Sequence, residues 1–163
     1  MSLASAAVKT IFDLPAHPLF VHVPVVLLPL IAIVTIVAAA RPSVARRLGI
    51  WLPIASLLVF VSVLLAVNTG EALDKAQDLG NVKHHKALAE TTRLLSFVLL
   101  LATVALWWVN RRRTVDAEAN RQRPLAMGVA AVTVVFAALS AVWVIRTGHE
   151  GARVHWSGVL KTK

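Results

Sequence analysis

The stretch PLFVHVPVVLLPLIAIVTIVAAA, residues 18–40, decides the fold of this chain. It contains no Asp, Glu, Lys or Arg, and as an α-helix it is about 34 Å long. The hydrocarbon core of a bilayer is roughly 30 Å thick, so this stretch is long enough to cross a membrane. Three further blocks without these charged residues cover residues 48–67, 94–109 and 125–145. We therefore expect four transmembrane helices.

The composition of the whole chain agrees with this expectation. The 163 residues are 58% hydrophobic and 15% charged, whereas about a quarter of a soluble domain is charged. The short third block extends toward its N-terminus because Glu90 and Arg93 are spaced i,i+3 and neutralise each other on one helix face. The sequence thus predicts an all-α, four-transmembrane-helix bundle in a single domain, residues 1–163, with spans at residues 18–40, 48–68, 87–109 and 125–146.

The basic residues predict the orientation in the membrane. Residues 41–47 contain three Arg and residues 110–123 contain five. Cytoplasmic loops are enriched in Lys and Arg, so we expect these two loops in the cytoplasm and both termini outside it. The net charge of +9 comes from residues that flank the apolar blocks. We therefore expect contact with the lipid bilayer and no binding of nucleic acid.

A short internal repeat predicts two related helical hairpins. Residues at the segment ends of the first pair have counterparts in the second pair: Thr69 and Gly70 match Thr147 and Gly148, and His17 and His22 match His85 and Glu90. An axis along the membrane normal would relate two such hairpins.

All six histidines lie at the same predicted ends of the four segments. His22 lies one turn inside the first span, where an unpaired imidazole is costly. In a chain without Cys, imidazoles and carboxylates are the side chains that bind first-row metals. We expect His22, His85 and His149 to be the cofactor or metal ligands, and the further candidates are His17, His155, Glu71 and Glu90.

Three functions fit these residues. Two histidines from different helices bind haem b axially in apolar surroundings, for electron transfer. Histidines with carboxylates bind a non-haem transition metal, for metal handling or metal-dependent catalysis. In the third alternative the histidines only cap helices, and the protein is a structural or partner-binding module without a cofactor. These alternatives leave open whether the protein is an enzyme.

Two absences make other classes of protein less favoured. No charged side chain lies near the middle of a predicted span, which disfavours a proton-coupled transporter. The sequence also has no Ser/His/Asp or phosphate-loop signature, which disfavours hydrolase and nucleotide chemistry.

Three segments carry a family resemblance: His-Pro-Leu-Phe-Val-His-Val-Pro at residues 17–24, His85, and Thr-Gly-His-Glu-Gly-Ala at residues 147–152. They resemble the bacterial membrane family called domain of unknown function 2231, whose opening reads roughly His-Pro-x-x-Val-His-x-Pro. The resemblance spans essentially the whole chain and implies a compact four-helix protein of the bacterial inner membrane. Members occur joined to or beside Rieske-type and other redox modules. The resemblance does not supply an established activity; its context suggests haem binding or electron transfer, with a redox protein as partner.

Overall fold

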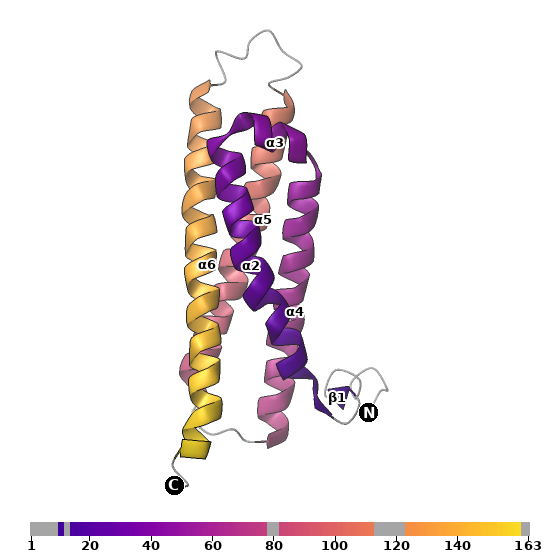
Figure 1. The fold of residues 1–163 in the computed structure, drawn as a ribbon, viewed down its shortest axis with the longest axis vertical. Coiled ribbons are helices and arrows are strands. Elements are labelled where there is room, and N and C mark those ends of the chain that lie inside the picture. Colours follow the sequence, from indigo (N-terminus) through magenta and orange to yellow (C-terminus); the bar gives the residue numbers. More distant parts are fainter. Residues whose placement is uncertain (1–9, 12–13, 78–81, 113–122, 161–163) are drawn as a thin grey trace.

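The computed structural model describes residues 10–11, 14–77, 82–112 and 123–160, and four long helices in it run side by side (Figure 1). Two short strands, β1 and β2, pair antiparallel ahead of the first helix. The elements in chain order are β1 (Thr10–Ile11), β2 (Leu14–Pro15), α2 (Ala16–Ala40), α3 (Pro42–Leu48), α4 (Trp51–Gln77), α5 (Lys83–Arg112) and α6 (Arg123–Leu160).

The four long helices confirm the predicted all-α membrane architecture. Each is long and apolar enough to cross a membrane, with candidate spans at His17–Ala40, Trp51–Lys75, Lys83–Arg111 and Arg123–Val154. Helices α4, α5 and α6 extend beyond the predicted apolar spans. The extensions carry polar residues. They remain helical because the backbone hydrogen bonds of a helix do not require apolar side chains.

The connection from α2 to α4 differs from the prediction. The second span was expected to begin at residue 48, but α4 begins at Trp51. Pro42 stands at the first positions of the short helix α3, where the missing N–H of proline costs nothing. Gly49 ends α3 with a φ of +52°, and its N–H donates to the Ala45 carbonyl. Because this φ favours glycine, the helix stops there and the chain turns into α4.

The bundle places α2 and α5 diagonally across from each other. Each of them packs along its length against both α4 and α6. Leu28, Ala32, Leu99 and Ala137 are fully buried between the helices. Large apolar side chains such as Ile33 are exposed on the outside of the bundle, and in a membrane this surface faces lipid rather than water.

Helices α5 and α6 share a seam of small and polar side chains. The buried residues on α5 alternate in steps of four and three, which is the spacing of a coiled-coil seam. Two hydrogen bonds cross this seam near the end of the bundle where α5 begins: Thr92 Oγ1 lies 2.8 Å from Thr147 Oγ1, and Ser140 donates to the Leu95 carbonyl at 3.2 Å. Such residues let membrane helices approach closely and join them by hydrogen bonds. The seam residues of α5 are Thr92, Ser96, Leu99, Thr103, Leu106 and Asn110.

Candidate functional site

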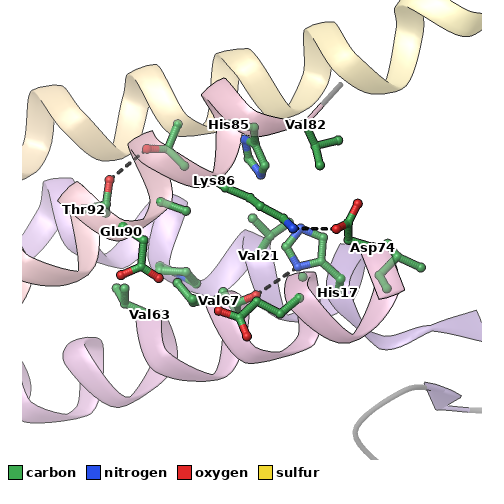
Figure 2. Close-up of a pocket in the computed structure, with 18 of the residues that line it drawn as sticks. His17, Val21, Val63, Val67, Asp74, Val82, His85, Lys86, Glu90 and Thr92 are labelled. Atoms are coloured by element: carbon green, nitrogen blue, oxygen red, sulfur yellow. Dashed lines mark hydrogen bonds and ion pairs between the residues drawn. The ribbon is translucent and has the colours of Figure 1, made fainter. Parts of the chain in front are cut away.

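A cavity of about 290 Å³ lies between the helices at one end of the bundle. We call this end the histidine end: α2 and α5 begin there, and α4 and α6 end there (Figure 1). The cavity, which we call the histidine pocket, is lined by residues of all four long helices, among them His17 and His85. Valines of α2, α4 and α6 contribute to its walls, and polar side chains such as Asp74 and Glu90 lie at different parts of it (Figure 2).

His17 enters the pocket from α2 and is held against α4. Its Nδ1 lies 3.0 Å from the carbonyl oxygen of Ala66. Because a carbonyl only accepts hydrogen bonds, this Nδ1 carries the proton, and in the neutral imidazole Nε2 keeps its lone pair. The ring also packs on Gly70, where an added Cβ would lie 3.0 Å from the ring carbon Cε1. Glycine at this position therefore makes room for the imidazole.

His85 has the corresponding position on the other hairpin. It enters from α5 and packs on Gly151 of α6, where an added Cβ would also lie 3.0 Å from the ring Cε1. The main chain of Thr147 interacts with this ring. The Nδ1 atom of His85 is buried and has no hydrogen-bond partner among the described residues. Each histidine thus packs on a glycine and lies beside the main chain of the residue one helical turn earlier, Ala66 for His17 and Thr147 for His85.

The two imidazole rings lie edge to face across the pocket. Their ring centroids are 6.5 Å apart and their planes make an angle of 78°. Since α2 and α5 are diagonal helices, the pair spans the bundle rather than lying along one helix face. In Figure 2 His85 and His17 come from opposite sides of the pocket, and the Lys86 side chain extends between them.

Charged residues surround this pair. The Lys86 ammonium of α5 lies 2.5 Å from an Asp74 carboxylate oxygen of α4, so an ion pair bridges the two helices at the pocket mouth. Glu71 and Glu90 also line the pocket. Glu150, which is only 8% exposed, accepts two hydrogen bonds from Arg153 and acts electrostatically on His84 and His85.

The structure brings together some of the predicted ligands and separates others. His17, His85, Glu71 and Glu90 line the histidine pocket, whereas His22 and His149 do not. His22 and His149 are exposed, and the His22 ring hydrogen-bonds the Pro18 carbonyl of its own helix. The side chain of His155 lies outside the described residues. Within the described part of the chain, no group of three His, Cys, Asp or Glu side chains could hold a metal ion.

Helix geometry explains why the side chains of His17 and His22 point in different directions. Five residues correspond to about 500° of rotation, so the two side chains point roughly 140° apart. A helix that turns His17 into the bundle therefore turns His22 toward its outer surface. The same geometry separates His149 from Gly151, which packs on His85.

The predicted repeat is out of register on α6. It matched Gly70 with Gly148, but Gly148 packs on Val25. The glycine that packs on a histidine is Gly151, about one turn later. Sequence reasoning missed both histidine–glycine contacts and the Lys86–Asp74 ion pair. The signal for the second contact was the spacing of four residues between Thr147 and Gly151, which is the spacing between Ala66 and Gly70 in the first hairpin.

The fold and the site together define a four-helix integral membrane protein with a paired-histidine pocket at one end. A family model described as a predicted membrane protein, DUF2231, matches residues 13–163. The chain therefore belongs to this family, and the resemblance inferred from residues 17–24, His85 and residues 147–152 is confirmed. No curated protein and no solved structure matches the chain significantly.

Proposed function

We propose that this membrane protein binds haem b between His17 and His85 and serves electron transfer. The observation that carries the proposal is the pair of imidazoles that enter the pocket from diagonal helices, with 6.5 Å between ring centroids. Metal–imidazole nitrogen bonds are about 2.0–2.1 Å long, so two imidazoles that held one metal between them would have centroids roughly 6 Å apart. The spacing of the pair fits this arrangement, which would require the Lys86 side chain to leave the space between the rings (Figure 2). When bound, haem b supplies a one-electron couple between ferric and ferrous iron.

The surroundings of His17 also fit a ligand. Metal-binding histidines usually donate their other ring N–H to a carbonyl or a carboxylate, which fixes the tautomer and the ring orientation. The Ala66 carbonyl has this position for His17. For His85, the buried and unpartnered Nδ1 and the nearby Thr147 main chain supply the corresponding neighbourhood.

The number of ligands favours haem over a bare metal ion. A structural or catalytic metal ion takes at least three protein ligands, and the described residues contain no such group. A porphyrin supplies four nitrogens of its own, so two histidines suffice. Val21, Val25 and Val63 give the pocket the apolar walls that a porphyrin contacts.

A non-haem metal is the second candidate, and the carboxylates favour it. Asp74, Glu71 and Glu90 line the same pocket as the two histidines, and carboxylates with imidazoles bind first-row metals. Such a site would serve metal handling or metal-dependent catalysis, and it would require Asp74 to release Lys86.

The proposal also places the site in the cell. The loops that contain three and five Arg support a cytoplasmic location for the end opposite the histidine end. The pocket would then lie near the outer surface of a bacterial inner membrane, with both termini on that side. The family resemblance supports a Rieske-type or other redox protein as the partner that exchanges electrons there.

Purification of the protein with haem supplementation tests the proposal by absorption spectroscopy and a pyridine haem assay. We expect a haem spectrum in the wild type and loss of most bound haem in His17→Ala and His85→Ala. His22→Ala is the matched control, because His22 is a histidine of the same helix that is exposed, and it retains the haem.

Three other results point elsewhere. Loss of haem in His22→Ala or His149→Ala, with retention in His17→Ala, supports the ligand set predicted from the sequence. A colourless protein with a metal found by elemental analysis supports the non-haem site. A protein with neither cofactor supports the structural module.

A further inference from the structure

A second hollow of about 560 Å³ lies between α4 and α5, outside the histidine pocket. We call it the α4–α5 groove; its lining includes Phe60 of α4 and Glu90, Arg93, Leu94 and Phe97 of α5. Leu94 is 61% exposed and Phe97 42%. Because these exposed side chains belong to a candidate membrane span, the groove opens sideways toward lipid.

The groove contains an ion pair near the predicted end of a membrane span. Arg93 and Glu90 pair within one helix turn, and each side chain remains nearly half exposed. Glu90 lies within the candidate span that begins at Lys83 and three residues into the apolar span predicted from the sequence, which is about 4.5 Å along the helix. Charged side chains inside a membrane are rare and indicate function by default. Pairing neutralises these two charges, yet the carboxylate can still accept hydrogen bonds and the guanidinium can still donate them.

Glu90 connects the groove with the histidine pocket. It lines both hollows, and Figure 2 shows its carboxyl between α5 and α4, beside Val63. A ligand whose polar end meets Glu90 from the lipid side is therefore separated from the histidine pocket by one side chain.

We propose that the α4–α5 groove binds the ring of a membrane-dissolved quinone or quinol. The quinol or quinone ring matches the polar and the apolar residues of the groove. A ring hydroxyl would donate to Glu90 or a ring carbonyl would accept from Arg93, and Phe60 and Phe97 would contact the flat ring. The two phenyl rings pack against each other with centroids 5.4 Å apart, so the quinone ring would lie against them rather than between them. The hydrocarbon tail of the ligand remains in the lipid.

Two other occupants fit the groove less well. The phosphate of a phospholipid would meet the Glu90 carboxylate, which repels it. A second copy of the chain would have to cover the exposed Leu94 and Phe97 with the same face. The proposed binding does not require a cofactor; only a role of the quinol as electron donor rests on the proposed haem.

Equilibrium binding of decylubiquinone to the full-length protein in phosphatidylcholine nanodiscs tests the proposal. Leu94→Trp fills the groove, and we expect it to weaken binding about tenfold or more. Leu101→Trp is the matched control, because Leu101 is also exposed and lies two turns further along the same face of α5. Glu90→Gln keeps the shape of the side chain and tests the hydrogen bond separately. Thermal unfolding and haem content are measured on every variant.

The outcomes separate this proposal from the proposed haem site. Quinone binding that depends on Leu94 supports the groove, including in a protein that binds no haem. Haem binding without quinone binding, or equal quinone binding by both Trp variants, overturns the groove and leaves the haem site standing.

Since the chain has no Cys, Leu94→Cys reports self-association through a disulfide at the groove. A disulfide-linked dimer of this variant, without quinone binding to the wild type, identifies the groove as a subunit interface and overturns the proposal. Displacement of decylubiquinone by phospholipid headgroups alone also overturns it.

Discussion

The two helical hairpins, α2 with α4 and α5 with α6, hold their histidines in the same way but are joined differently. His17 packs on Gly70 of its hairpin partner, and His85 packs on Gly151 of its own. Hydroxyl groups join α5 to α6 across the seam. Between α2 and α4 the Thr69 hydroxyl lies 3.4 Å from His17 Nδ1, whereas the buried Thr35 hydroxyl of α2 has no partner among the described residues. The pocket therefore depends on the same histidine–glycine contact in both hairpins, whereas different side-chain hydrogen bonds join the two helices of each hairpin.

The two histidines also differ in their hydrogen bonds. The Ala66 carbonyl orients the His17 ring, whereas the buried Nδ1 of His85 has no such bond in the described structure. The main chain of Thr147 lies beside the His85 ring instead. Substitutions at the two glycines test what these contacts contribute.

The largest effect is expected from larger side chains at the two glycines. Gly70→Val and Gly151→Val place atoms where the imidazoles now lie, since even a Cβ would be 3.0 Å from each ring. Overpacking of this kind costs about 1–3 kcal/mol. We expect Gly70→Val to cost more than Gly151→Val, because displacing His17 also breaks its hydrogen bond to Ala66. Reversible thermal unfolding in detergent, followed by circular dichroism, measures both.

Gly128→Val is the control for these two variants. Among the described residues, nothing lies within 4 Å of a Cβ at Gly128, and Gly128 is also inside α6. A loss of stability as large in Gly128→Val as in the other two would show that helix propensity, not contact with histidine, is responsible.

The four helices could be predicted from the sequence, but the inward faces of the histidines could not. Apolar length alone predicts a span, and it needs no knowledge of neighbours. Rotation about the helix axis needs a polar stripe to distinguish inside from outside, and residues 18–40 have no charged residue to supply one. The sequence favours His22 because it lies one turn inside the apolar span, but this position does not say which way the side chain points, and His17 lines the pocket. The Gly151 contact was missed for a related reason, since it depends on how α6 packs against α5.

A smaller effect is expected from the seam of the second hairpin. Thr92→Val keeps the shape of the side chain but removes its bonds to the Thr147 hydroxyl and to the Leu88 carbonyl. Hydrogen bonds between membrane helices contribute about 0.6 kcal/mol on average and at most about 1.7 kcal/mol. We expect a loss of stability in this range. A cycle with Thr147→Val isolates the pair: if the two losses simply add, the hydroxyls do not interact across the seam.

The smallest effect, with the opposite sign, is expected at the first hairpin. Thr35 is fully buried, and its Oγ1 has no hydrogen-bond partner among the described residues. A buried hydroxyl without a partner costs about 1–3 kcal/mol relative to an apolar group of the same shape, although bonding to the backbone of its own helix lowers this cost in membranes. We therefore expect Thr35→Val to raise the free energy of unfolding by up to about 1 kcal/mol. The same unfolding experiment compares it with Thr92→Val. Equal losses in the two variants would mean that Thr35 is as well bonded as Thr92, and that the hairpins do not differ as the structure indicates.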